Sequence, residues 1–476
     1  MQNSQSPFQC LLEAAKTAKE AGNLALGRNL LIHCLDLSLN FLELSAVNAE
    51  IKAFPLSVNQ ELRLAVLATS TVEPLLEALR LNLEIRNFKV EIYNSPYDSI
   101  EQEVLNSESG LYRFSPTHVL LLMDAEDLDF VHSLEQLRGN PALFQENQWP
   151  KFAMIWNCLK KIPSCQVIQS TIAIPPERYA GQLENRAAWG NVRLIDELNR
   201  SIRANSDHLA VLDMDFLSAV YGKNNWFDRF FWFHSKQAFA PSAIALVSKE
   251  ITRILLAMAG AGKKCLVLDL DNTLWGGVIG DDGVDGLELG MSSVAGEAFV
   301  EFQKYLKRLK DRGVILAVCS KNQENTARIP FQNHSAMALT EEDISCFVAN
   351  FENKADNIRR IAKSLNIGLD SLVFFDDNPA ERKLVRDLIP EVYTVEVPEN
   401  PSLFVRALDE LGLFEIDQLS PEDLQRTAQY RANADREQLK EGATDLTDYL
   451  KSLDMTCYTE KAVAEKSERL LQLINK

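Results

Sequence analysis

An apolar run of four residues that ends in two closely spaced aspartates most constrains how this chain folds. Residues 265–268 (CLVL) are followed directly by Asp269, and Asp271 comes two positions later. Strands buried on both faces of a parallel sheet have continuous apolar runs of this kind. The arrangement occurs twice more, in residues 314–319 followed by Ser320 and in residues 371–375 followed by Asp376 and Asp377. Because the carboxyl ends of parallel strands meet at one edge of a sheet, we expect these polar residues to converge there.

Helical patterns lie between these runs. Residues 297–312 place several large apolar side chains on one face, and Gly313 ends the pattern. Lys354 opens a second amphipathic helix. Asn378 and Pro379 are typical of an N-cap and of a first helical position. The alternation of strands and helices predicts an α/β domain with a Rossmann-like parallel sheet over residues 260–400.

An earlier part of the chain shows the same alternation. Residues 64–69 form its first apolar run, and Pro74 opens a helix over 75–83. Further strands are expected at 90–93, 118–123, 152–156 and 208–212. We therefore predict a separate α/β layer domain over residues 59–250.

The two ends of the chain are predicted to be helical. Residues 10–46 have helical apolar spacing, which indicates one or two helices within an N-terminal segment 1–58. Residues 401–476 are charged and also helical in pattern. Because that pattern continues up to Lys476, we expect this C-terminal segment to be truncated.

Charge and apolar patterning exclude several classes of partner. The chain has 49 basic and 67 acidic side chains and a net charge of −18, so we expect no nucleic-acid partner and no anionic membrane partner. No run approaches the roughly 20 apolar residues of a membrane span, and the N-terminus has no signal-peptide core. The eight cysteines are scattered without metal-binding spacing. These features predict a cytoplasmic protein with reduced thiols.

The polar residues at the predicted sheet edge form a set suited to phosphoryl transfer. Of two carboxylates one residue apart, one can attack phosphorus while the other protonates the leaving oxygen. Ser320 can hydrogen-bond phosphoryl oxygens, and Lys354 can offset the negative charge gathered there. Asp376 and Asp377 add hard oxygen ligands that suit Mg²⁺. Each piece alone is common in turns and at helix starts, but their joint order favours an active site.

This pattern resembles the haloacid dehalogenase (HAD) superfamily, whose four motifs fall here on Asp269-x-Asp271-x-Thr273, Ser320, Lys354 and Asp376-Asp377. The resemblance implies that Asp269 is the nucleophile and Asp271 the general acid and base. It places Mg²⁺ on Asp269, Asp376 and the carbonyl of Asp271, with Asp377 as a further candidate ligand. Ser320 and Lys354 would hold the phosphoryl group.

Longer stretches resemble the FkbH-like subfamily of that superfamily. They are residues 269–280 (DLDNTLWGGVIG), 318–322 (VCSKN), 374–382 (FFDDNPAER) and 107–112 (SESGLY). The resemblance implies an SGNH-hydrolase-like α/β domain before the HAD-like domain. It also implies an enzyme of polyketide biosynthesis that takes D-1,3-bisphosphoglycerate and releases phosphate. Such an enzyme loads a glyceryl group onto the phosphopantetheine thiol of an acyl carrier protein.

The flanking residues of these motifs are candidates for substrate binding. They are Thr273, Trp275, Gly276, Ser320, Lys321 and Asn322. The segments 274–319 and 321–353 are too short for a full cap domain over the site, and an open site can admit a carrier protein. Acyl transfer could pass through an enzyme thioester, for which Cys319 is the candidate. Strand alternation points Cys319 and Ser320 to opposite faces, so a buried structural cysteine and direct attack by the carrier thiol are the competing interpretations.

The predicted first domain lacks the usual hydrolase motif. Thr69, Ser70 and Thr71 stand where Gly-Asp-Ser is expected, and His234 is too loosely spaced from Asp228 for the usual Asp-x-x-His. We therefore expect a degenerate domain. Two basic helical groups could dock an acidic carrier, namely Lys304, Lys307, Arg308 and Lys310, and Arg382, Lys383 and Arg386. The alternative functions are a small-molecule phosphatase without acyl transfer and a non-catalytic carrier-docking protein.

Overall fold

The structure is a computed structural model that describes residues 6–37, 39–55, 60–421, 423–424 and 429–430. It is a mixed α/β structure with two five-stranded sheets. The described residues form two compact units, one within residues 1–264 and 369–420 and the other within residues 265–368 and 421–476. Among the described residues, no helix combines the length and the apolar character that a membrane span requires.

The strands of the first sheet are β1 (Gln60–Ala68), β2 (Phe88–Asn94), β3 (His118–Leu122), β4 (Gln166–Ser170) and β5 (Ala210–Leu212). Their order is β2-β1-β3-β4-β5, and every neighbouring pair is parallel. The sheet is buried on both faces. Leu64 and Val66 of β1 pack into one apolar core, whereas Ala65 and Leu67 pack into another, as the two-residue period of a strand requires.

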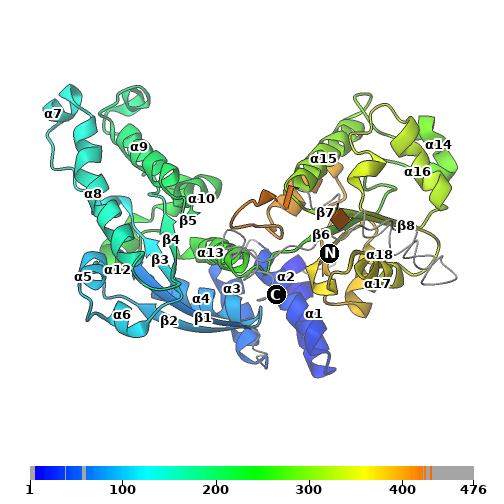
Figure 1. Cartoon of the computed structure of the whole chain (residues 1–476), viewed down its shortest axis with the longest axis horizontal. Helices are drawn as coiled ribbons and strands as arrows, with labels where there is room; N and C mark the ends of the chain where they lie inside the picture. Colours follow the sequence, from blue (N-terminus) through cyan, green and yellow to red (C-terminus); the bar gives the residue numbers. More distant parts are fainter. Residues whose placement is uncertain (1–5, 38, 56–59, 422, 425–428, 431–476) are drawn as a thin grey trace, which may run out of the picture. The chain divides into compact units, whose positions relative to one another are not determined.

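Helices cover both faces of this sheet. α4 (Glu73–Glu84) and α13 (Ile244–Met258) share the first core, and α8 (Ala142–Leu159) and α9 (Asn191–Ala204) share the second (Figure 1). Between the strands lie also α5 (Ile100–Leu105), α6 (Gly110–Phe114) and α7 (Leu134–Gly139), and after β5 come α10 (Met214–Tyr221), α11 (Lys223–Trp226) and α12 (Arg229–Ser235).

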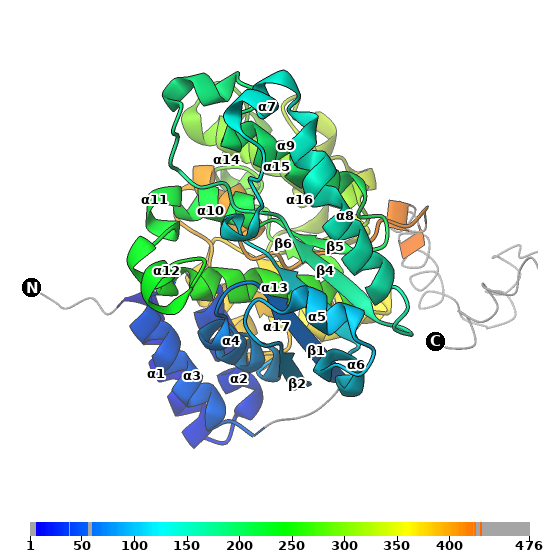
Figure 2. The ribbon, with the colours of Figure 1, turned by 90° about the vertical axis from the view of Figure 1, so that its left-hand side faces the viewer.

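Three helices precede the first sheet: α1 (Pro7–Glu20), α2 (Leu24–Asp36) and α3 (Phe41–Lys52). Figure 2 shows them side by side, and their buried faces join the core that α4 and α13 form. The sequence predicted one or two helices here. The chain divides further because Asn23 and Asn40 each cap a new helix with their side-chain oxygens.

The second sheet has the order β10-β9-β6-β7-β8. Its strands are β6 (Cys265–Leu268), β7 (Ile315–Ser320), β8 (Cys346–Ala349), β9 (Leu372–Phe375) and β10 (Tyr393–Thr394). The associated helices are α14 (Ile279–Gly286), α15 (Val294–Asp311), α16 (Glu324–Asn333), α17 (Lys354–Leu365), α18 (Pro379–Leu388) and α19 (Phe404–Asp409). The pairs β6–β7, β7–β8 and β9–β10 are parallel, so the expected α/β class and the parallel second sheet are confirmed.

One predicted strand is wrong. Residues 152–156 lie inside α8, where Phe152, Ile155, Trp156 and Leu159 are buried at helical spacing. The strand in this region is β4, which was not predicted, because its buried Gln169 and Ser170 break the apolar run. Of the predicted helical segment 401–476, α19 lies in the described part, and most of the rest lies outside the described residues.

A buried amide holds the loop at the carboxyl end of β4. The Asn199 side chain accepts from the Ile172 backbone N–H at 2.7 Å and donates to the Ile172 carbonyl at 2.8 Å. Asn199→Ala leaves both buried groups without a partner, so we expect the free energy of unfolding to fall by about 3 kcal/mol. Urea denaturation followed by tryptophan fluorescence measures this. Asn205→Ala, on an exposed amide of the same helix end, is the control, and an equal loss in both variants would contradict the assignment.

Candidate active site

A buried ion pair lies at the end of β6. Asp269 directly follows this strand, and its Oδ2 lies 2.8 Å from Nζ of Lys354, the first residue of α17. Lys354 is 2% exposed and Asp269 is 8% exposed. A buried charge of either sign is costly unless it is paired, so each side chain fixes the other. The structure thus joins the predicted nucleophile to the predicted phosphate-binding lysine.

The other carboxylate oxygen of Asp269 has no hydrogen-bond partner among the residues that the structure describes. Oδ1 is buried and unsatisfied, and leaving a charged oxygen in that state is unfavourable. A cation beside it would remove this cost. Oδ1 is therefore the atom of this site that most clearly favours a bound metal ion.

Three carboxylates are close enough to share one cation. One oxygen from each of Asp269, Asp376 and Asp377 lies within 4.8 Å of the others. Opposite ligands of an octahedral Mg²⁺ are about 4.2 Å apart, so this spacing fits that ion. Asp376 and Asp377 follow β9, which neighbours β6 in the sheet. Both the spacing of these carboxylate oxygens and their character as hard donors therefore fit Mg²⁺.

Three donors hold the carboxylate of Asp271. Its Oδ1 accepts from the indole N–H of Trp275 at 2.9 Å and from the backbone N–H of Ile279 at 3.1 Å. Its Oδ2 accepts from the Asn322 amide at 2.9 Å. A carboxylate held in this way has a fixed direction, as a proton donor to a leaving group needs. Because these donors engage both oxygens of the side chain, the arrangement also agrees with metal binding by the backbone carbonyl of Asp271.

The stretch after Asp271 is a tight flap. Asn272 has φ of 56° and Gly277 has φ of 92°, both in the left-handed region, and the Asn272 side chain accepts from the Gly277 backbone N–H at 3.0 Å. Gly276 exchanges two backbone hydrogen bonds with Glu288. A Cβ on Gly276 would lie 2.9 Å from the Cβ of Glu288, which explains why a glycine is needed there.

The other predicted binding residues separate into buried and exposed groups. Thr273, Trp275, Ser320 and Asn322 are buried, whereas Lys321 is exposed. The Asn322 amide also lies 3.3 Å from the Ser320 hydroxyl. Because Trp275 and Asn322 both contact Asp271, their placement favours positioning of that acid over direct contact with substrate.

The structure adds Arg382, whose role the sequence did not suggest. It is 8% exposed, and its Nη1 donates to the carbonyls of Asp376 at 2.9 Å and Asp377 at 2.7 Å. Arg386 pairs with Glu396, which leaves Lys383 as the exposed member of the predicted docking group. Arg382 thus anchors the acidic loop and is unavailable for docking. An arginine four residues into the helix after Asp-Asp-Asn-Pro was the only signal of this in the sequence.

Cys319 is buried within β7. It has no exposed surface, and its thiol donates to the backbone carbonyl of Lys354 at 3.8 Å. An acyl carrier needs a reachable thiolate. The placement therefore favours the structural interpretation of this cysteine.

The described residues at the equivalent edge of the first sheet differ from those of the candidate active site. Ser70 is buried beside a cavity of about 30 Å³, which is room for about one water molecule. His234 is exposed on α12, where its ring stacks on Phe230. Thr69 donates to Asp124 at 3.2 Å, and burial raises the pKa of Asp124 to about 7. These positions support the predicted loss of hydrolase function.

Comparisons with known proteins show which proteins this chain is similar to. The family described as FkbH, N-terminal domain, matches residues 63–256. A solved structure, the N-terminal part of a Bacteroides fragilis protein containing a phosphatase domain and complexed with Mg, is 32% identical. The similarity covers 80% of this chain and 100% of that one, with a TM-score of 0.71. No curated protein matches the chain.

The fold and this set of side chains define an α/β protein of the HAD superfamily, and the comparisons support a phosphatase of that type. Within the superfamily, the chain belongs to the FkbH-like family.

If Arg382 anchors the metal-binding loop, Arg382→Ala should weaken Mg²⁺ binding by roughly 10- to 100-fold, as is typical when a residue that orients metal ligands is lost. Isothermal titration calorimetry with Mg²⁺ measures this. Lys383→Ala changes the adjacent exposed cation, whose ion pair is with Asp387, and should leave the affinity unchanged. Equal affinities for the wild type and Arg382→Ala would show that the loop needs no such anchor.

Proposed function

We propose that this protein is a cytoplasmic, magnesium-dependent phosphatase and glyceryl transferase of polyketide biosynthesis. It takes D-1,3-bisphosphoglycerate, releases phosphate and loads a glyceryl group onto the phosphopantetheine thiol of an acyl carrier protein. The observation that carries the phosphatase half is the buried Asp269, which pairs with Lys354 through one oxygen, has its other oxygen unsatisfied and lies close to the carboxylates of Asp376 and Asp377. The transfer half is supported by membership of the FkbH-like family.

In the phosphatase step, the residues of the site act one after another. A carboxylate oxygen of Asp269 attacks phosphorus and forms a P–O bond while the bond from phosphorus to the leaving oxygen breaks. Asp271 gives its proton to that leaving oxygen, and water then attacks the aspartyl phosphate as Asp271 takes the proton back. Ser320 and Lys354 hold the phosphoryl oxygens. Asp269, Asp376 and Asp377 would hold Mg²⁺, and the bound ion would supply charge stabilisation at the phosphoryl group.

The transfer step needs no further activation of the substrate. Carbon one of bisphosphoglycerate is already an acyl phosphate, so a carrier thiolate can attack it, form the thioester and displace inorganic phosphate. Because Cys319 is buried and hydrogen-bonded, we propose direct attack by the carrier thiol. The ester phosphate at carbon three is the substrate of Asp269.

Phosphate release should require both the metal and the nucleophile. Removing Mg²⁺ with EDTA, or changing Asp269→Asn, should lower the rate of phosphate release by roughly a thousandfold or more, since either change removes a group that acts in the transition state. A colorimetric phosphate assay measures the rate. Asp281→Asn, an exposed acid in the same stretch, is the control and should be as active as the wild type. Full activity in EDTA would refute a metal-dependent site.

Carrier loading separates the two halves of the proposal. Intact-protein mass spectrometry of phosphopantetheinylated carriers, incubated with enzyme, Mg²⁺ and bisphosphoglycerate, should show a carrier heavier by one glyceryl group. Cys319→Ala should retain loading, as should Cys10→Ala, which changes an exposed cysteine. Phosphate release without a loaded carrier across several candidates would leave a small-molecule phosphatase. Loss of loading in Cys319→Ala alone would favour an enzyme thioester.

A further inference from the structure

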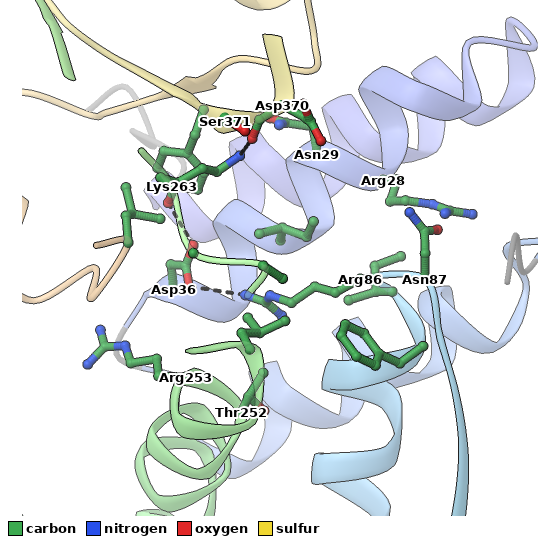
Figure 3. A pocket seen from close by; sticks show the side chains of 18 of the residues that line it. Arg28, Asn29, Asp36, Arg86, Asn87, Thr252, Arg253, Lys263, Asp370 and Ser371 are labelled. Carbon is green, nitrogen blue, oxygen red and sulfur yellow. Dashed lines mark hydrogen bonds and ion pairs between the residues drawn. The ribbon is translucent and has the colours of Figure 1, made fainter. Parts of the chain in front are cut away.

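A cavity of about 880 Å³ lies in the unit that contains the first sheet, apart from the candidate active site. α2, the turn before β2 and the C-terminal end of α13 line it, together with residues of the stretches 260–264, 370–371, 390–393 and 411–415 (Figure 3). Its volume is within the range of pockets that bind small organic molecules. Nothing in the proposed phosphatase mechanism uses it.

The charged lining of the cavity is unusual for this chain. Six cationic side chains and four acidic ones line it, which gives a net charge of +2 in a protein whose overall charge is −18. The cations are Arg28, Arg86, Lys249, Arg253, Lys263 and Lys264, and the acids are Asp36, Asp370, Glu391 and Glu415. The lining of the cavity thus has a net positive charge, whereas the chain as a whole has a net negative charge.

Asp36 organises part of this charge. Figure 3 shows the Arg86 side chain reaching Asp36, with the two charged groups 3.4 Å apart. Lys249 donates to the Asp36 backbone carbonyl at 2.8 Å, and the Asp36 side chain accepts from the Tyr393 hydroxyl at 2.6 Å. The Asp36 carboxylate is therefore shared by the guanidinium of Arg86 and the phenol of Tyr393, whereas the ammonium of Lys249 donates to the neutral backbone carbonyl.

Arg253 pairs with Glu250, but two other cations of the lining donate to neutral carbonyl oxygens. Lys263 donates to the carbonyl of Asp370, and Arg28 donates to the carbonyl of Pro55 at 2.7 Å. Burial lowers the pKa of Lys263 to about 8, and burial also lowers the pKa of Arg86 and of Lys249. An added anion would favour the charged forms of these groups.

Two buried polar atoms on lining residues have no partner. They are Oδ1 of Asn29 and Nε of Arg253. Asn29 comes from α2 and Arg253 from α13 (Figure 3). Unsatisfied buried polar atoms are rare in folded proteins, and at a cavity they are consistent with a missing ligand or water.

We propose that this cavity binds a small organic anion of about nucleotide size. Its phosphate or carboxylate groups would lie against the cationic side chains of Arg28, Arg86, Lys263 and Lys264. Its less polar part would lie against the apolar lining, which includes Leu24, Ile32, Phe88 and Leu256. Planar guanidinium groups bind both phosphate and carboxylate, so the proposal defines the ligand by its charge and its size.

The position of the cavity separates it from catalysis in a defined way. Lys264 and Ser371 line it, and they immediately precede β6 and β9. The predicted catalytic aspartates follow the opposite ends of these strands. A ligand here therefore lies beside residues that adjoin the starts of two strands of the second sheet.

Isothermal titration of the full chain in EDTA tests the proposal. Adenosine diphosphate probes organic phosphates, citrate probes polycarboxylates, and adenosine is the neutral control. We expect at least one anion to bind at one site per chain, with an affinity that falls as salt is added. Arg28→Gln and Lys264→Gln, on half-buried and exposed side chains that should tolerate the change, should weaken binding about tenfold or more. Lys16→Gln on α1, outside the cavity, should not.

The pattern of binding decides the outcome. Binding of only one of the two anions, with the same loss in Arg28→Gln, supports the proposal and identifies the charged group that is recognised. Binding of neither anion would overturn it. Binding that is as tight in Arg28→Gln and Lys264→Gln as in the wild type would also overturn it, because the ligand would then lie elsewhere.

Discussion

The ion pair between Asp269 and Lys354 is the interaction on which the rest of the site depends. Both side chains are almost fully buried, and removing either partner of such a pair typically costs about 3–5 kcal/mol. The pair joins the end of β6 to the start of α17, and it points one oxygen of Asp269 at the lysine. The other oxygen is left for a cation. The fold thus holds charged groups that are not fully paired, and a bound metal ion and phosphate would complete their pairing.

Around this pair, supporting residues fix the reacting groups. Trp275, Ile279 and Asn322 hold the carboxylate of Asp271, and Arg382 holds the carbonyls of Asp376 and Asp377. These contacts come from the flap, from the loop after β7 and from α18. A site built in this way is organised before substrate arrives, which is the main source of rate in phosphoryl transfer.

Much of this was predictable from sequence because the strands of the second sheet are continuous apolar runs that end in polar residues. The predicted strand 265–268 matches β6, and the predicted helix start at Lys354 matches α17. Arg382 and the shared Asp36 were not predictable, since their partners are backbone atoms or residues distant in the chain. The strand assigned to 152–156 failed because a short apolar run fits a buried helix equally well.

Trapping the phosphorylated enzyme tests the central claim most directly. The enzyme is mixed with Mg²⁺ and bisphosphoglycerate, quenched in acid and digested, and its peptides are analysed by mass spectrometry. The account predicts one added phosphoryl group on the peptide that contains Asp269, and none on the same peptide of Asp269→Asn. Phosphate release with no label at Asp269, or a label on another residue, would contradict it.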